Sequence, residues 1–167
     1  MIEVSKPGLQ DTVQDLGRYG YQKFGVVAGG VMDPFSHRIA NLLVGNEESA
    51  ASLEMTLVGP RLLFREDALV AICGGDLAPT IANMPVPMWK PVFIRKGSEL
   101  KFGAAKAGSR AYLAVAGGFD VSEVLGSRST YVKDEAWRVG RKGAQEGGCP
   151  SSYIRGFDDY KRNNCFR

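Results

Sequence analysis

The sequence is poor in the residues that build metal centres and disulfide frameworks. Its 167 residues include one histidine, His37, and three cysteines, Cys73, Cys149 and Cys165. The cysteines are odd in number and lack the short spacings of zinc ligands. We therefore expect free thiols and no metal site. Cys73 lies in an apolar segment and is predicted to be a small buried hydrophobe.

Long apolar runs are also missing. No stretch approaches the roughly 20 apolar residues that a helix needs to cross a bilayer. The first residues, Met1 to Lys6, lack the basic-then-apolar order of an export signal. We therefore expect a cytoplasmic protein with no membrane partner.

A strong excess of one charge is missing as well. The formal net charge is +3, and residues 1–132 hold 13 basic and 13 acidic side chains, so the whole excess lies after residue 132. A protein that binds nucleic acid usually concentrates lysine and arginine on one face or along one element. The charge pattern therefore does not indicate a nucleic-acid partner.

The chain does have a succession of short apolar segments separated by turn residues. Hydrophobic residues make up 44% of the sequence, enough for the core of one domain. The predicted strands are 2–5, 53–58, 61–64, 68–73, 80–82, 91–94, 99–102 and 110–116. Glycine and proline separate them at the spacing of a compact antiparallel β-barrel or sandwich. The predicted fold class is mainly β.

One helix is predicted over residues 33–45. Asp33 is an acid suited to cap the helix, and Pro34 fits the first helical position because no backbone donor is needed there. Gly45-Asn46 supplies a left-handed stop at the other end.

The spacing of apolar residues in this helix predicts which side is buried. Four residues recur at the three- and four-residue steps of one face, namely Phe35, Ile39, Leu42 and Leu43. His37, Arg38 and Asn41 should then point largely away from the core. No serine, cysteine or acid is arranged around His37 as in a nucleophile pattern, so we interpret it as an exposed helix residue.

Residues 11–41 are the predicted functional segment. They bring together acids, arginines, amides and glycines, with almost no strand periodicity before the helix. Polar side chains on irregular backbone between regular elements are where binding sites usually lie.

The end of the chain does not share the organisation of the rest. Hydrophobic periodicity stops near Asp134, and aromatic residues then lie among charges and glycines. This composition predicts disorder. Alternatively, the reading frame slips near Lys133, because residues 135–148, read one nucleotide later with permissible codons, give a sensible continuation of the preceding segment. We predict a domain over 1–132 and a disordered or out-of-frame tail over 133–167.

Four motifs in residues 8–132 are specific enough to indicate a family. They are GLQDTVQDLGRYGYQKFGV, GGVMDPFSHRIANLLVGN, SLEMTLVGP and RAYLAVAGGFDVSEVLGSRST. In this order they resemble the biotin-dependent carboxyltransferase-like family, whose members are also called allophanate hydrolase subunit 2, KipI antagonist or the C subunit of 5-oxoprolinase. The resemblance implies a cyclophilin-like antiparallel β-barrel that forms the N-terminal half of a two-part chain.

The resemblance also implies a function and partners. It indicates a subunit of an assembly that opens 5-oxoproline to glutamate with hydrolysis of ATP, with a KipI-like subunit and a LamB/YcsF-like subunit as partners. ATP, and magnesium with it, would be used by the assembly, and biotin is not expected to bind this chain. The alternatives are a regulatory module that antagonises a KipI-type kinase inhibitor, a component related to carboxyltransferase or allophanate hydrolase, and an inactive fragment.

Opening a lactam requires a polarised carbonyl, an activated oxygen nucleophile and a protonated leaving nitrogen. Carboxylates can orient water or move a proton, and arginines can stabilise an oxyanion. The catalytic candidates are Asp15, Arg18, Asp33 and Glu54. The substrate-binding candidates are Arg38, Asn41, Arg110, Ser127 and Arg128. We expect the arginines and acids to line one shared pocket.

Structural roles compete with these functional ones. Asp33 also fits a helix cap, and Asp15 and Arg18 are close enough to pair across a turn. Glu54 alternates with apolar neighbours on a strand, so it faces either solvent or a cleft, with solvent the default. Asn41 also suits a bond to backbone.

The segment Gly126-Ser-Arg-Ser-Thr130 has two interpretations. Its hydroxyls, guanidinium and backbone donors suit an anion pocket. It also suits a capped turn after a short helical turn at residues 121–125.

Overall fold

The computed structural model describes residues 1–130 and 153–154 of the chain. Its strands are β1 Ile2–Lys6, β2 Gln10–Gln14, β3 Ser52–Thr56, β4 Arg61–Phe64, β5 Ala68–Asp76, β6 Thr80–Ile81, β7 Met84–Pro85, β8 Pro91–Ile94, β9 Glu99–Lys101, β10 Ala107–Val115 and β11 Tyr153–Ile154. The helices are a 3-10 turn, η1 Gln22–Phe24, and α1 Pro34–Leu43. The prediction of a mainly β fold with one α-helix is confirmed.

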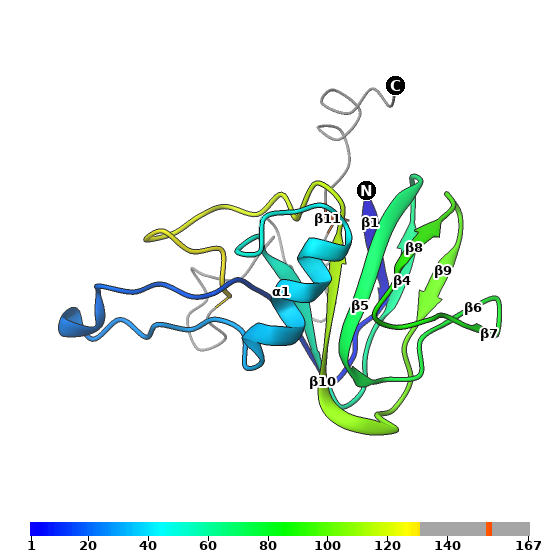
Figure 1. The fold of residues 1–167 in the computed structure, drawn as a ribbon, viewed down its shortest axis with the longest axis horizontal. Helices are drawn as coiled ribbons and strands as arrows, with labels where there is room; N and C mark the ends of the chain where they lie inside the picture. The colour runs from blue at the N-terminus through cyan, green and yellow to red at the C-terminus, as the bar shows by residue number, and fades with distance from the viewer. Residues whose placement is uncertain (131–152, 155–167) are drawn as a thin grey trace, which may run out of the picture.

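The strands form two antiparallel sheets. One has the order β11-β1-β4-β9-β6-β7 and the other the order β2-β3-β10-β5-β8. Figure 1 shows α1 on the outer face of the second sheet, so the molecule has three layers. The segment between β2 and α1 and the segment after β10 both project from this helix side. The pairing of the described strands gives two sheets and not one closed barrel.

Alternation along β10 explains why the middle sheet is buried on both faces. Ala111, Leu113 and Val115 belong to the core between the sheets, and Tyr112 and Ala114 to the core under α1. Successive side chains of a strand point to opposite faces, so both sets come from one continuous apolar run.

The helix side of the middle sheet is built mainly from small residues. Ala71, Cys73 and Ala114 are fully buried there, which lets α1 lie close to the strands. Burial raises the pKa of the Cys73 thiol to about 11, although a hydrogen bond from the Trp89 backbone acts in the opposite direction. The prediction that Cys73 is a small buried hydrophobe is confirmed.

The predicted ends of α1 are correct. Both Phe35 and Ser36 donate their backbone N–H groups to Asp33 Oδ1, each at 3.1 Å, so Asp33 caps the helix. Gly45 has a φ of +77°, the left-handed conformation expected after the last turn.

The predicted buried face of α1 is wrong for Phe35 and Leu42, whereas Ile39 and Leu43 are partly buried and pack against the core under the helix. Phe35 is 67% exposed and Leu42 is 55% exposed. The buried helix residues are instead Ser36, His37, Ala40 and Asn41. They lie at helical spacing, so the helix is rotated to place a polar and small-residue face on the sheet.

Several local predictions also need correction. Residues 10–14 were expected to be irregular, yet they form β2, which pairs with β3 along its whole length. The hairpin from β6 to β7 was not anticipated, because Ala82 and Asn83 adopt positive φ without a glycine. The predicted tail falls mostly outside the described residues, and Tyr153–Ile154 pairs with β1 as β11. No helix among residues 1–130 is long and apolar enough to span a bilayer.

A pair of truncations tests the orientation of α1. Val44→Ala removes a side chain that is 2% exposed and should lower the free energy of unfolding by about 2 kcal/mol. Leu42→Ala removes a larger but exposed side chain and should cost less than about 1 kcal/mol. Guanidinium unfolding of both variants measures the difference. A larger loss for Leu42→Ala would restore the face predicted from the sequence.

Candidate functional site

A polar layer covers one half of the helix-facing surface of the middle sheet. Leu53 and Met55 of β3 face the core between the sheets, so Ser52 and Glu54 face the other way. Thr12 and Gln14 of β2 pair opposite Glu54 and Ser52. All four polar side chains are buried. Buried polar groups need partners, and α1 and the loops supply them for Gln14 Nε2, Glu54 and Ser52, whereas Gln14 Oε1 has none among the described residues.

Glu54 is the centre of this layer. Its side chain is 6% exposed, and its Oε1 accepts a hydrogen bond from Arg110 Nη1 at 2.6 Å. Its Oε2 accepts from the Tyr112 hydroxyl and from the Met32 backbone N–H, both at 2.9 Å. The solvent-facing default predicted for Glu54 is therefore wrong.

Tyr112 extends the contacts of Glu54 to the start of α1. Its hydroxyl donates to Glu54 and accepts a bond from the Asp33 backbone N–H at 2.9 Å. Burial raises the pKa of Tyr112, and the Glu54 charge raises it further, so the phenol keeps its proton. The strands thereby fix the position at which the helix begins.

Asp15 holds the segment after β10 against the segment after β2. Its carboxylate accepts bonds from the Ser127 hydroxyl at 2.7 Å, the Ser129 hydroxyl at 2.6 Å, and the backbone N–H groups of Gly17 and Arg128. Burial alone raises the pKa of Asp15, but these hydrogen bonds outweigh it and the pKa is lowered. In this position the Asp15 carboxylate joins the two segments by hydrogen bonds.

The Gly126–Thr130 motif is a tight turn followed by an irregular segment that hydrogen bonds hold in place. Leu125 and Gly126 both have positive φ, and Val124 and Ser127 bond to each other across them. The helical turn considered at residues 121–125 is therefore absent. Arg18, which is 2% exposed, donates to the Ser129 carbonyl at 2.5 Å and fixes the motif from the opposite side.

The other two predicted arginines lie at the surface. Arg38 approaches Glu48 at 3.9 Å, and Arg128 approaches Glu123 at 3.3 Å, with all four side chains between 43% and 57% exposed. Exposed pairs of this kind contribute little to stability. The expectation that Asp15, Arg18, Arg38 and Arg128 line one shared pocket is therefore wrong.

His37 and Asn41 are buried on the helix face that contacts the sheet. His37 Nδ1 is 2.7 Å from Ser52 Oγ, whereas Nε2 has no hydrogen-bond partner among the described residues. Asn41 donates to the Ala50 carbonyl at 2.7 Å and accepts from Asn46 at 3.1 Å, so it binds the turn after the helix. The exposed position predicted for His37 is wrong.

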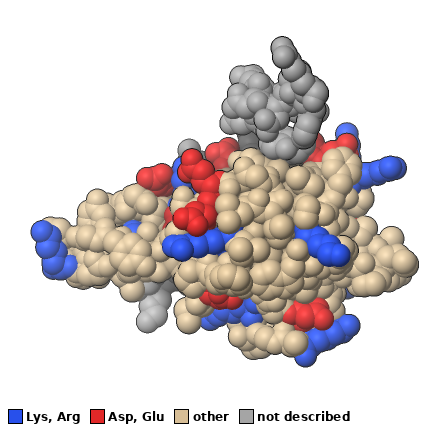
Figure 2. Space-filling model, in the orientation of Figure 1, with Lys and Arg blue, Asp and Glu red and all other residues tan. Residues whose placement is uncertain are grey.

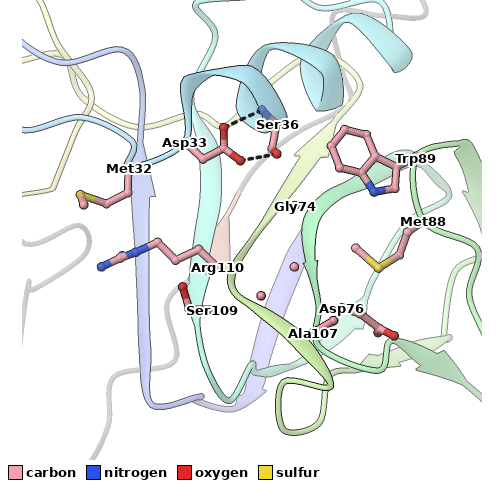
Figure 3. Close-up of a pocket in the computed structure, with 12 residues that line it drawn as sticks. Met32, Asp33, Ser36, Gly74, Asp76, Met88, Trp89, Ala107, Ser109 and Arg110 are labelled. Carbon is pink, nitrogen blue, oxygen red and sulfur yellow. Dashed lines mark hydrogen bonds between the residues drawn. The ribbon is translucent and has the colours of Figure 1, made fainter.

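A cavity of about 660 Å³ opens where α1 begins and β5 ends. Its lining residues are Met32, Asp33, Ser36, Gly74, Gly75, Asp76, Met88, Trp89, Ala107, Gly108, Ser109 and Arg110. In Figure 3, Arg110 and Met32 lie on one side, Trp89 and Met88 on the other, and Asp33 and Ser36 at the head. Two of the predicted site residues, Asp33 and Arg110, line this cavity, and Arg110 is bonded to Glu54.

The floor of this pocket is glycine backbone at a bulge between β5 and β10. Pairing jumps from Ala107–Asp76 to Ala111–Gly74, so β10 carries two extra residues. A Cβ on Gly75 would lie 2.9 Å from the Ala107 carbonyl oxygen, which is too close without movement of the backbone. These glycines therefore let β5 and β10 approach each other closely at the bulge.

Trp89 was not identified from the sequence. It has a φ of +59°, a conformation rare for a residue with a side chain, and its N–H donates to the Ile72 carbonyl at 2.8 Å. Its ring lies 6.3 Å from that of Phe35 at the mouth of the pocket. Strained backbone of this kind often marks a binding site. Asp76 and Tyr112 were also missed, whereas Asp33 and Arg110 were identified as candidates by residue type.

Charges on the surface are mixed. Figure 2 shows basic and acidic side chains interspersed on the face in view, separated by neutral surface. Among the described residues, no group of three or more histidine, cysteine or acidic side chains is placed to hold a metal ion. The catalytic and binding roles assigned from the sequence stay predictions.

Comparison with known proteins places these features in a family. The family described as "Carboxyltransferase domain, subdomain A and B" matches residues 24–145, beyond the domain end predicted at 132. Urea amidolyase of Lachancea kluyveri is 46% identical over 131 residues, which are 78% of this chain and 7% of that protein. The C subunit of 5-oxoprolinase from Escherichia coli is 38% identical over 133 residues, which are 80% of this chain and 43% of that protein.

A solved structure supports the same relationship. The crystal structure of K. lactis urea amidolyase superposes with a TM-score of 0.75 and 43% identity, over 77% of this chain and 8% of that one. The chain thus spans less than half the length of each of these three relatives.

The single histidine makes a pH test of the polar layer simple. Burial lowers the pKa of His37, and the Arg38 charge lowers it further, while Asp15 and Glu54 oppose the shift. The unfolded chain takes up a proton near the ordinary value of 6.5, and the folded chain only at lower pH. The free energy of unfolding should therefore fall as the pH drops below 6.5, until the pH passes the folded pKa.

Guanidinium unfolding between about pH 7.5 and about pH 5 measures this dependence, and NMR of the imidazole gives the folded pKa directly. In His37→Gln, the part of the pH dependence that is due to histidine should vanish. The part due to carboxylates should remain in both the native chain and the variant. An imidazole that titrates at or above the ordinary value would contradict the buried, neutral histidine.

Proposed function

Because the chain belongs to the family of the carboxyltransferase domain, subdomain A and B, we propose that it supplies the amide-binding part of an enzyme site. The observation that supports this best is the pocket between α1 and the β5–β10 bulge. It combines an arginine, an aromatic wall and exposed backbone in one open cavity. Binding sites for small molecules typically combine apolar walls with a few polar groups in this way.

The pocket suits a planar amide. The Trp89 indole offers a flat apolar surface on one side of the pocket. Arg110, held by Glu54, supplies N–H donors at the edge of the cavity. A donor aimed at a carbonyl oxygen polarises the amide and stabilises negative charge that develops during attack.

In the first specific form of this proposal, the chain is a 5-oxoprolinase subunit that works with a KipI-like and a LamB/YcsF-like subunit and uses ATP. The related C subunit of E. coli 5-oxoprolinase supports it, with 38% identity. The chain covers 43% of that protein, which therefore contains further polypeptide. In the regulatory alternative, the chain binds a KipI-like protein and catalyses no reaction.

In the second form, the amide is urea and the reaction is a carboxyl transfer. This form is supported by the higher identity to urea amidolyase, 46% against 38%. Both forms require the same pocket chemistry, an amide carbonyl near Arg110 and a planar group near Trp89.

Reconstitution tests the first form. The purified chain is mixed with the KipI-like and LamB/YcsF-like subunits, ATP, magnesium and 5-oxoproline, and glutamate is measured. Arg110→Lys keeps the charge but loses the forked donor geometry, so turnover should fall about 10- to 100-fold. Arg95→Lys, at an exposed position outside the pocket, is the matched control and should keep full turnover.

The outcomes separate the alternatives. Association of the proteins without glutamate would support the regulatory module, and no association would support an inactive fragment. Equal turnover in Arg110→Lys and the control would exclude this pocket from the reaction. Saturable binding of urea to the chain, with no turnover of 5-oxoproline, would favour the second form.

A further inference from the structure

The charges that line the pocket are mostly negative. Arg110 is the one cation among the described lining residues, and Asp33 and Asp76 are carboxylates. Arg110 is already bound to the buried Glu54 at 2.6 Å and also donates to Thr56 Oγ1 at 3.2 Å. The pocket and the carboxylate behind it thus hold three negative groups and one positive group.

Arg110 is poorly placed to leave Glu54 for another carboxylate. Figure 3 shows its side chain extending toward Met32, along the side of the pocket. If Arg110 moved to a ligand, Glu54 would stay buried with one less partner and the same charge. Leaving a buried charge with fewer partners is strongly unfavourable.

The two lining carboxylates differ in what they can offer a ligand. Asp33 uses Oδ1 for two backbone N–H groups of α1 and Oδ2 for the Ser36 hydroxyl. Asp76 uses Oδ1 for the Ala78 N–H at 2.7 Å. Among the described residues, no donor is bonded to Asp76 Oδ2. Asp76 is therefore the lining carboxylate with an oxygen available to accept a bond from a ligand.

We propose that Asp76 determines the specificity of this pocket, selecting an uncharged amide whose N–H donates to its carboxylate and excluding ligands that carry a carboxylate of their own. The inference rests on the proposed function and deepens it by naming the substrate class. Two like charges in one partly enclosed site repel each other, and the one cation is already neutralised. A neutral N–H group gains a charge-assisted hydrogen bond instead.

This selectivity bears on the two forms of the function. It admits urea itself, which is uncharged and rich in N–H donors. In the lactam form, the ring amide of 5-oxoproline would enter the pocket while its carboxylate stays outside, within reach of the partner proteins.

Two lactams that differ only in the carboxylate test the inference. 2-Pyrrolidinone and 5-oxoproline share the same ring, and each is titrated into the ¹⁵N-labelled full chain. The chemical shift of the Trp89 indole N–H, assigned with Trp89→Phe, reports binding at the pocket. Ligands this small bind at about millimolar concentration. We expect 2-pyrrolidinone to bind about tenfold more tightly than 5-oxoproline, with the difference shrinking as salt is added.

Variants of two aspartates separate specificity from general charge. Asp76→Asn should weaken the binding of 2-pyrrolidinone and strengthen the binding of 5-oxoproline. The ratio of their affinities should then fall to about threefold or less. Asp120→Asn makes the same change at an exposed position outside the pocket and should leave the ratio unchanged.

The failures are distinguishable. If both lactams bind and 5-oxoproline binds as tightly as 2-pyrrolidinone, the selectivity is overturned and the amide pocket stands. If the ratio is tenfold but Asp76→Asn leaves it unchanged, the assignment to Asp76 is overturned. If neither lactam nor urea shifts the Trp89 signal, the proposed function of this pocket fails, and the inference fails with it.

Discussion

The rest of the site depends on one buried carboxylate. Glu54 accepts bonds from a strand tyrosine, a strand arginine and a loop backbone N–H, and so links the middle sheet to the segment that leads into α1. A buried charge is tolerated only when it is paired and hydrogen-bonded, so these groups have little freedom to separate. The same contacts orient Arg110 on the wall of the pocket. The hydrogen bonds of Glu54 thus both stabilise the polar layer and set the geometry of the site.

Local signals in the sequence predicted the regular elements well. Asp33-Pro34 and Gly45 mark helix ends because capping and left-handed φ are properties of a few neighbouring residues. Strands at 61–64 and 91–94 were predicted with their observed bounds, since turn residues isolate them. The face of α1 was not predictable in this way. Amphipathic spacing singles out large apolar residues, but the sheet face under α1 consists of small residues such as Ala71 and a polar part that includes Ser52.

The site itself was only partly predictable, because residues far apart in sequence form it. Asp33 and Arg110 were identified as candidates by residue type, but their meeting in one cavity follows from the fold. Asp15 was identified as a catalytic candidate, yet its carboxylate is occupied by the Ser127 and Ser129 hydroxyls. Trp89 carries no sequence signal, since its left-handed backbone depends on the bond to Ile72.

Hydrogen exchange of two loop amides tests the central role of Glu54 most directly. The Met32 side chain is 68% exposed, yet its N–H is bonded to Glu54, and the Asp33 N–H is bonded to Tyr112. Both amides should be protected in the native chain. In Glu54→Gln their protection should fall at least about tenfold, while amides between β5 and β10 keep theirs. Unprotected Met32 and Asp33 amides in the native chain, or unchanged exchange in the variant, would contradict this account.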